Sequence, residues 1–199
     1  MPVLALFIDL ITKAPEYYFS IIIAVVISIV LHELGHGVAA IWQGDDTPKV
    51  TGHMTWNPMV HMGGFSLFLL VMAGIAFGQM PVTPSRFRSR YGNAMVAAAG
   101  PVTNLLLALI GLTIFGLWVK YGSLGPEGVP TAGQRFFWLF GMINLVLCVF
   151  NMLPIPPLDG STVLADFSPP FRRVMRNPDN QPFFMGAFLL VFFFAGWIF

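Results

Sequence analysis

Two histidines and a glutamate lie inside a long apolar stretch near the start of the chain. The stretch runs from Tyr17 to about Trp42, residues 19–31 carry no charged side chain, and the motif H-E-L-G-H occupies residues 32–36. An apolar run of this length is typical of a membrane-spanning helix. A charged group at mid-helix costs about 2.5–3.5 kcal/mol on insertion scales, so ionisable side chains at this depth indicate a functional site.

The spacing within the motif predicts which function the site serves. On a helix, residues four apart lie on one face, about 6 Å apart along the axis, so His32 and His36 can hold one metal ion. Glu33 stands beside the first ligand, where it can take a proton from an attacking water. This is the H-E-x-x-H pattern of zinc hydrolases. In a soluble helix the same letters can fall by chance on a solvated face, but a helix in hydrocarbon has no such face.

The composition also places the chain in a membrane. Hydrophobic residues make up 56% of the 199 residues and charged residues 10%, with a mean hydropathy of +0.76. Ordinary soluble domains carry about 25% charged residues. The length allows one compact bundle, so we expect a single domain over residues 1–199. The net charge of +1 says nothing about partners, and no basic cluster with interleaved aromatics suggests a nucleic-acid partner, so we expect none. Cys148 is the single cysteine, so no internal disulfide is expected.

Further apolar runs predict a helical bundle of about four spans. The predicted spans cover residues 17–42, 94–119, 136–153 and 183–199. The run at 65–80 is marginal in length for a span and contains two glycines, so we expect a re-entrant segment. Residues 49–62 mix β-formers with Gly and Pro and predict a short extended or β segment. Residues 1–12 lack the basic region of a signal peptide and predict a short interfacial helix. The expected fold class is an all-α polytopic membrane protein.

Arginine clusters predict the orientation of these spans. Clusters at residues 86–90 and 172–176 are expected in the cytoplasm by the positive-inside rule. If residues 65–80 are re-entrant, the first helix runs inward and His32 lies about 15 Å of helix below the cytoplasmic interface, with Asp159 on the same side. If that run crossed fully, His32 and Asp159 would lie near opposite faces. We favour the re-entrant form, in a cytoplasmic membrane and with the site toward the cytoplasm.

A catalytic zinc usually has three protein ligands and one position for water, so a third ligand is required. Asp159 follows three prolines that must break the preceding helix, and broken helices in membranes line protein interiors or water-filled cavities, where ion sites are built. Its carboxylate can turn toward the metal, or it can cap a helix beginning at Gly160-Ser161. Local chemistry leaves both open. The other acids lie mostly in loops, where a solvated charge is expected: Asp9, Glu16, Asp45, Asp46, Glu127, Asp166 and Asp179.

Three motifs together carry a family resemblance. H-E-L-G-H at residues 32–36 is followed by G-P-V-T-N at 100–104 and by N-M-L-P-I-P-P-L-D-G at 151–160. In this order they resemble the site-2 protease family of intramembrane zinc metalloproteases, in a compact form without PDZ or CBS domains. The resemblance implies one Zn²⁺ per chain, held by His32, His36 and Asp159, with Glu33 as the general base.

The resemblance further implies a zinc-dependent endopeptidase that cleaves transmembrane or membrane-proximal peptide bonds. The implied partners are the lipid bilayer and a membrane-protein substrate, the transmembrane segment of a regulator or a signal-peptide remnant. Such a segment must be unwound before attack, and the extended residues 49–62 are a candidate edge to bind it. No particular oligomeric state is predicted.

Several polar residues remain for roles around the metal. Asn104 and Asn151 are candidate donors to the oxyanion of the reaction, because each lies near the cytoplasmic end of a predicted helix. For each, an interhelical hydrogen bond is an equal alternative, and Asn144 is expected to make only such a bond. His53 and His61 are interfacial histidines, for which we expect neither a catalytic nor a metal role.

Two other kinds of protein compete with a protease. A metal-binding membrane protein or transporter can use the same ligands without hydrolysis. A transporter would carry further acids or histidines along a path through the membrane, and the runs at 94–119 and 136–153 supply none besides asparagines. An inactive scaffold is the third possibility, but the intact Glu33 argues against it.

Overall fold

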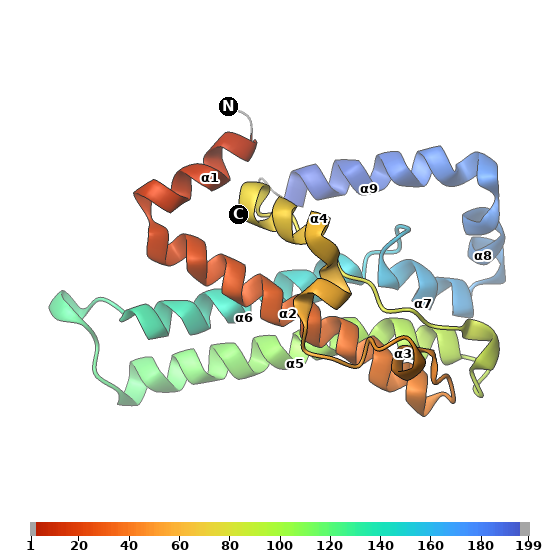
Figure 1. Cartoon of the computed structure of the whole chain (residues 1–199), viewed down its shortest axis with the longest axis horizontal. Coiled ribbons are helices and arrows are strands. Elements are labelled where there is room, and N and C mark those ends of the chain that lie inside the picture. Colours follow the sequence, from red (N-terminus) through yellow and green to blue (C-terminus); the bar gives the residue numbers. More distant parts are fainter. Residues whose placement is uncertain (1–2, 196–199) are drawn as a thin grey trace.

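The computed structural model describes residues 3–195 and consists of helices joined by turns and one long extended segment (Figure 1). The α-helices are α1 Val3–Lys13, α2 Pro15–Trp42, α3 Thr47–Val50, α4 Pro58–Ala73, α5 Gly92–Tyr121, α6 Ala132–Asn151, α7 Asp159–Phe167, α8 Pro169–Arg176 and α9 Gln181–Ala195. Short 3-10 turns lie at Pro84–Arg86, Pro126–Gly128 and Pro178–Asn180. The expectation of an all-α membrane protein is confirmed.

The centre of the bundle is a layer of three long helices. α5 packs against both α2 and α6, running opposite to them, and α2 also contacts α6 (Figure 1). These three are the helices in the described part of the chain that are long and apolar enough to cross a membrane. α9 covers the start of the last predicted span, whereas residues 196–199 of that span lie outside the described residues.

Local sequence explains where these helices begin. Pro15 opens α2 at a position where a missing N–H costs nothing, and Glu16 follows in the first turn, where the helix dipole favours an acid. Thr131 and Gln134 form a reciprocal capping box at the start of α6.

Small residues let the central helices approach closely. A Cβ on Gly111 of α5 would lie 3.1 Å from the backbone of Gly141 on α6. On the other side of α5, a Cβ on Gly35 of α2 would lie 3.0 Å from the carbonyl oxygen of Ala99. Close backbone contact of this kind is a common way for helices to associate where lipid removes the hydrophobic driving force.

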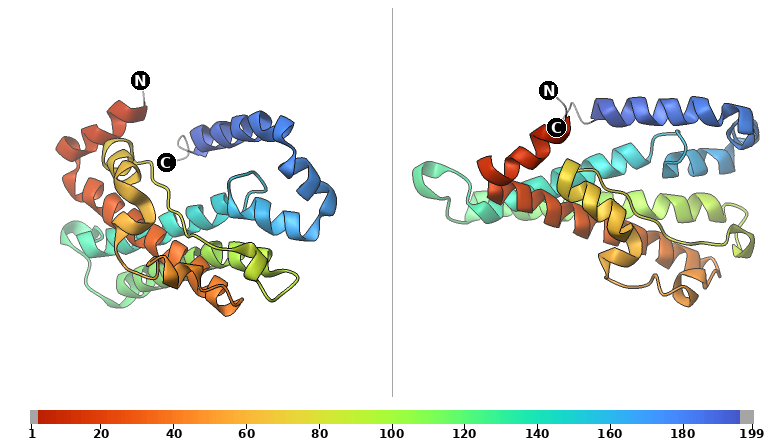
Figure 2. Two further views of the ribbon diagram at one scale, coloured as in Figure 1. Left: turned by 45° about the vertical axis from the view of Figure 1, so that its right-hand side comes forward. Right: turned by 45° about the horizontal axis from the view of Figure 1, so that its top comes forward.

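α4 and the segment after it form a hairpin across α2. α4 is kinked at Gly63, which has a φ of 67°, and it ends at Gly74, whose φ of 72° is the left-handed conformation that terminates helices. Residues 75–83, called the return segment below, then run extended back along α4 to the end of α2 (Figure 2). The chain between the end of α2 and the start of α5 thus begins and ends at the same end of the bundle.

Hydrogen bonds hold the return segment in place. Phe77 N–H donates to Ser66 Oγ at 2.9 Å, and the same hydroxyl donates to the Phe77 carbonyl at 2.7 Å. Gln79 N–H donates to the His61 carbonyl at 2.9 Å. Thr83 N–H donates to Oδ2 of Asp45, which lies just beyond α2.

The β form of the segment expected over residues 49–62 is not found, because residues 3–195 contain no strand. Instead, the end of α3, a series of turns and the start of α4 occupy this stretch. The physical reason is local hydrogen bonding. Asn57 Oδ1 accepts from Met59 N–H at the start of α4, and such side-chain bonds to backbone compete with strand pairing.

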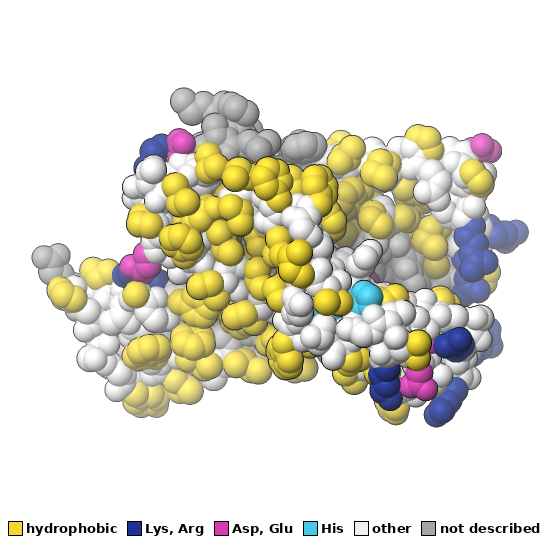
Figure 3. All heavy atoms as spheres, viewed as in Figure 1, with side chains coloured by type: hydrophobic (Ala, Val, Ile, Leu, Met, Phe, Trp, Pro, Cys, Tyr) yellow, Lys and Arg dark blue, Asp and Glu magenta, His cyan; other side chains and the backbone are white. Residues whose placement is uncertain are grey.

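Charged and apolar side chains separate along the bundle. Apolar side chains cover the middle of the face in Figure 3, and the lysines and arginines gather mainly at one end. Many apolar side chains point outward, including Leu106 and Leu109 of α5, which are 55% and 56% exposed. In water such a surface would be costly, so it fits contact with lipid.

Candidate active site

Two histidines on α2 face each other one helical turn apart. The Nε2 atoms of His32 and His36 are 3.0 Å apart, and both side chains are buried. The backbone here is regular helix, so the four-residue spacing alone places both rings on the same face. The pair lies toward the carboxyl end of α2, beside the start of α5.

The other ring nitrogen of each histidine is held by α5. Nδ1 of His36 lies 2.7 Å from the carbonyl oxygen of Val96, and Nδ1 of His32 contacts Oδ1 of Asn104. A carbonyl oxygen can only accept, so His36 carries a proton on Nδ1, and in the neutral ring Nε2 is the nitrogen that can bind a metal. Histidines that bind metals are oriented by such outer partners.

Asp159 completes the group from the first turn of α7. Its Oδ2 lies 3.2 Å from Nε2 of His32 and 3.4 Å from Nε2 of His36. This oxygen is buried and has no hydrogen-bond partner, and Asp159 is the first residue of α7, whose N-cap position is Leu158. Of the two roles that the sequence left open for Asp159, the geometry favours the one turned toward the histidines.

The three converging atoms can hold one metal ion. Among the described residues, His32, His36 and Asp159 are the one such group of ligand side chains. An orphaned buried carboxylate oxygen is costly unless it binds something, and a cation between these atoms would satisfy it. Gly100 of α5 leaves the necessary space, because a Cβ there would lie 2.4 Å and 2.5 Å from the two histidine Nε2 atoms. The residues present therefore fit a metal ligated by two imidazoles and one carboxylate.

Glu33 lies next to this group in a cavity of about 430 Å³. Its side chain is buried and has no hydrogen-bond partner among residues 3–195. A Cβ on Gly78 of the return segment would lie 2.6 Å from Glu33 Oε1, so only a glycine lets the backbone pass this close. The cavity is lined by Glu33 and the three ligand side chains, by the return segment and its continuation, and by residues of α5, α6 and α7.

The two asparagines predicted as oxyanion donors lie in different places. Asn151 lines the cavity, and its Nδ2 donates to the Leu147 carbonyl of its own helix at 2.9 Å. Asn104 is fully buried behind His32 and donates through Nδ2 to Asn144 Oδ1 at 2.9 Å. The position of Asn104 does not fit donation to a reaction intermediate. It favours the alternative of an interhelical hydrogen bond.

The remaining histidines lie outside the ligand group. His61 is buried with Nε2 at 2.7 Å from the Thr55 carbonyl oxygen, and His53 uses Nδ1 toward Thr51. Both belong to the stretch around the start of α4.

Sequence reasoning missed the return segment as part of the site. Gly78, Gln79, Met80 and Val82 line the cavity, whereas the sequence predicted only that the apolar run at 65–80 is re-entrant. A glycine followed by two spaced prolines is a sign of extended backbone that could have indicated it.

Asp45 was also missed, since a loop acid is expected to be solvated. Its side chain is fully buried, accepting from Thr47 N–H at 3.0 Å and from Thr83 N–H, with Arg86 at 3.8 Å. Burial by itself raises the pKa of Asp45, but the hydrogen bonds from Thr47 and Thr83 and the nearby Arg86 outweigh it and hold the pKa below its ordinary value. The D-x-T-P pattern, in which an acid bonds the amide two residues on, is the signal that could have found it.

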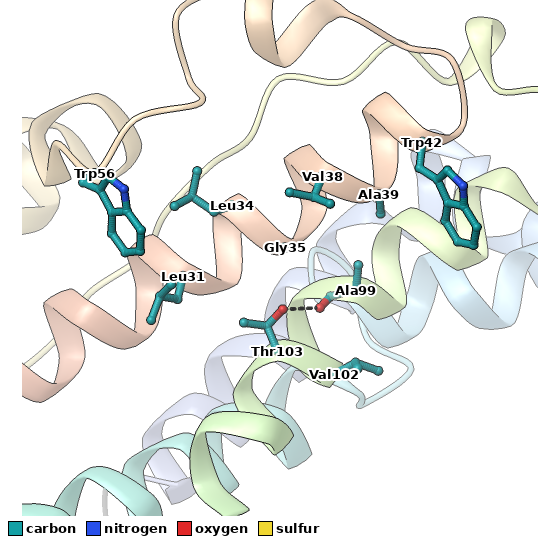
Figure 4. A pocket seen from close by; sticks show the side chains of 10 residues that line it. All are labelled: Leu31, Leu34, Gly35, Val38, Ala39, Trp42, Trp56, Ala99, Val102 and Thr103. Atoms are coloured by element: carbon teal, nitrogen blue, oxygen red, sulfur yellow. Dashed lines mark hydrogen bonds between the residues drawn. The ribbon is translucent and has the colours of Figure 1, made fainter. Parts of the chain in front are cut away.

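A second hollow lies on a different face of α2, between it and α5 (Figure 4). It is lined by Leu31, Leu34, Gly35, Val38, Ala39, Trp42, Trp56, Ala99, Val102 and Thr103. None of these side chains is titratable, and the Thr103 hydroxyl is already bonded to the Ala99 carbonyl at 2.8 Å. This hollow has no catalytic chemistry.

The fold and the site together define a helical membrane protein with a buried group that can hold one metal ion beside a free glutamate. The model of peptidase family M50 matches residues 20–131 and 127–195. The chain therefore belongs to this family, which is the site-2 protease family that its motifs resemble.

Curated relatives support the same assignment. "Putative zinc metalloprotease YwhC" of Bacillus subtilis is 37% identical over 175 residues, which are 86% of this chain and 79% of that protein. "Putative zinc metalloprotease Rip2" of Mycobacterium tuberculosis is 30% identical over 203 residues, covering 94% of this chain and 74% of the relative. "Putative zinc metalloprotease sll0528" of Synechocystis is 35% identical over 69% of this chain, but the match covers only 28% of that longer protein. No solved structure gives a significant match.

Proposed function

We propose that the protein is a zinc-dependent endopeptidase that cleaves peptide bonds within or next to the membrane. The observation that carries this proposal is the convergence of His32, His36 and Asp159, with ligand atoms 3.0–3.4 Å apart, beside Glu33 on an apolar helix. Family membership supports a peptidase, and the relatives' names support zinc as the metal.

In this proposal the metal is held by Nε2 of both histidines and Oδ2 of Asp159. When bound, zinc supplies a Lewis acid that acidifies water and polarises the scissile carbonyl. Two imidazoles and a carboxylate are a ligand set that catalytic zinc uses, with one position left for water. The buried surroundings exclude competing water and strengthen each electrostatic interaction.

Glu33 acts as the general base. It takes the proton from the attacking water and delivers it to the leaving amine. Its carboxylate is available because it has no hydrogen-bond partner among the described residues. Asn151 lines the same cavity, and the Nδ2 hydrogen that is not used by Leu147 is a candidate donor to the oxyanion.

The proposed substrate is a membrane protein, such as a membrane-bound regulator or a signal-peptide remnant. A helical segment has its amides already paired, so it must be extended before attack. The return segment lines the cavity in extended form. In this proposal the extended substrate lies beside the return segment and not beside residues 49–62.

The proposed location is the cytoplasmic membrane, with the site toward the cytoplasm and α4 with the return segment as the re-entrant element. Seven of the ten lysines and arginines support this orientation, because they lie in α3, in α8 and in the stretch just before α5, at one end of the bundle (Figure 1). They are Lys49, Arg86, Arg88, Arg90, Arg172, Arg173 and Arg176.

The test is the Glu33→Gln variant in purified protein. Gln keeps the size of the side chain but cannot take a proton, so we expect zinc content near one per chain and cleavage of a model membrane substrate reduced about 10²–10⁴-fold. Zinc is measured by metal analysis and cleavage by gel assay.

The matched control is Glu16→Gln on the same helix, where an exposed glutamate pairs with Arg135 at 2.7 Å, far from the site. This variant should cleave at the wild-type rate. Unchanged cleavage by Glu33→Gln would eliminate the mechanism, and zinc absent from the wild type would eliminate the metal site.

A further inference from the structure

A continuous line of buried hydrogen bonds leads away from His32 through three helices. Asn104 of α5 contacts His32 Nδ1 and donates to Asn144 of α6 at 2.9 Å. Asn144 Nδ2 donates back to Ser28 Oγ of α2 at 2.8 Å, and Ser28 donates to the Ala24 carbonyl at 2.6 Å. Asn104, Asn144 and Ser28 are all fully buried.

The donor and acceptor of every hydrogen bond in this line can be assigned by starting from the Ala24 carbonyl, at the end farthest from His32. A carbonyl oxygen can only accept, so the single hydroxyl hydrogen of Ser28 goes to Ala24, and Ser28 Oγ must accept from Asn144. Asn144 Nδ2 also lies 2.9 Å from the Phe140 carbonyl, which likewise only accepts. Both hydrogens of the Asn144 amide are thus assigned, and its oxygen must face Asn104.

The same reasoning reaches the histidine. Because Asn144 presents an oxygen, Asn104 must present its amide nitrogen to it and turn its own oxygen toward His32. An oxygen facing His32 Nδ1 requires the ring proton to be on that nitrogen. In the neutral ring, Nε2 of His32 then carries no proton and can bind a metal on the side that faces Nε2 of His36 and Asp159.

We propose that Asn104, Asn144 and Ser28 are positioning residues that hold His32 in the tautomer that can bind metal. The proposal rests on the proposed function, since it concerns a ligand of the same metal. In it, Asn104 orients His32 and does not donate to the oxyanion in the cavity. His36 has the corresponding constraint from the Val96 carbonyl, which no side-chain substitution removes. His32 is therefore the ligand whose orientation depends on other side chains.

Two substitutions at Asn104 separate positioning from packing. Both Asn104→Leu and Asn104→Asp lose the donation to Asn144, but Asp keeps an oxygen that accepts from His32 Nδ1. We expect Leu to weaken zinc binding about 10–100-fold, as loss of an outer-shell partner does, and Asp to stay within about threefold of the wild type. Affinity is measured by competition with a chelator in detergent, and helix content by circular dichroism.

A second readout does not need the metal. In the apo protein with ¹⁵N-labelled histidine, His32 should carry its proton on Nδ1 in the wild type and in Asn104→Asp, and should shift toward the Nε2-protonated tautomer in Asn104→Leu. The His32 signal is identified as the one missing from His32→Gln.

Two serines on α2 supply a matched control pair. Ser28 and Ser20 both donate to the carbonyl four residues earlier, but only Ser28 accepts from Asn144. Ser28→Ala should reduce zinc affinity by a smaller factor than Asn104→Leu, because the Phe140 carbonyl still orients Asn144. Ser20→Ala should leave affinity unchanged.

The outcomes distinguish this inference from the proposed function. A wild type that binds no zinc would refute the proposed function, while the tautomer measurement would still decide the positioning role. Equal loss of zinc binding in both Asn104 variants, or an unshifted His32 tautomer in Asn104→Leu, would refute the positioning role and leave a packing role.

Discussion

Gly100 provides the space that the three ligand atoms surround. The two histidines come from α2 and the aspartate from α7, and Gly100 of α5 lies against both imidazoles, where any side chain would enter the position of the metal. The glycine is therefore required by the ligand group itself and not by backbone conformation, since it lies within a regular helix.

Gly100→Ala should abolish metal binding without unfolding the protein. The added methyl would lie within about 2.5 Å of both histidine Nε2 atoms, while alanine favours a helix interior by about 1 kcal/mol over glycine. Zinc content should fall below a tenth of the wild-type value at unchanged helix content. Gly116→Ala on the same helix, where a Cβ would meet nothing within 4 Å, is the control and should retain its zinc. Full zinc occupancy in Gly100→Ala would contradict the proposed metal position.

At the scale of elements, two side chains hold the return segment in its position beside the site. Ser66 of α4 binds it near its start, and Asp45 after α2 binds it near its end. Between these anchors Gly78 passes beside Glu33, so the position of the segment sets the shape of the cavity. Because the Asp45 anchor is a titratable carboxylate, the hold on this segment should weaken at acid pH.

Asp45→Asn should destabilise the protein at pH 7 and remove part of its acid sensitivity. The pKa of Asp45 is lowered in the folded protein, so its stabilising effect is complete above the ordinary value near 3.8 and is lost as the pH falls through the folded-state pKa. An asparagine would set an amide N–H against that of Thr83, at a cost of about 1–3 kcal/mol. Thermal unfolding in detergent between pH 7 and pH 3 measures both effects.

The neighbouring Asp46→Asn variant is the control, because Asp46 is exposed and pairs with Lys49 at 3.3 Å. It should change stability by less than about 0.5 kcal/mol. If Asp45→Asn unfolded at the wild-type temperature at pH 7, the buried carboxylate would not be an anchor.

On the scale of the whole molecule, charge distinguishes the two ends of the bundle. Seven of the ten basic residues lie in α3, in α8 and in the stretch just before α5, at the end near the site, whereas Lys13, Lys120 and Arg135 lie at the end of α1, the end of α5 and the start of α6. The central helices between them expose apolar side chains, as lipid contact requires.

Cysteine labelling tests this orientation. In a Cys148→Ala background, Ser85→Cys should react with a membrane-impermeant maleimide only from the cytoplasmic side, and Ser123→Cys only from the opposite side, since both serines are exposed and lie at opposite ends of α5. Labelling of residue 85 from outside would overturn the cytoplasmic placement of the site. Labelling of both from one side would overturn the orientation of α5 across the membrane.

The sequence alone determined membrane residence, the all-α class and the pairing of His32 with His36. These depend on composition and on the helical period, which sets the relative positions of residues within a turn or two. The pattern also singled out Asp159 as the unusual acid, but its role needed the family resemblance, because no local rule relates residues at opposite ends of a chain.

Only the tertiary structure decided how side chains from different helices meet. Packing of α2, α5 and α6 placed Asn104 behind His32 and Asn151 in the cavity, although each was expected near the cytoplasmic end of a predicted helix. It also buried Asp45 and brought the return segment beside Glu33. The physical reason is that burial and hydrogen-bond partners are properties of the packed bundle, whereas the chain order specifies only near neighbours.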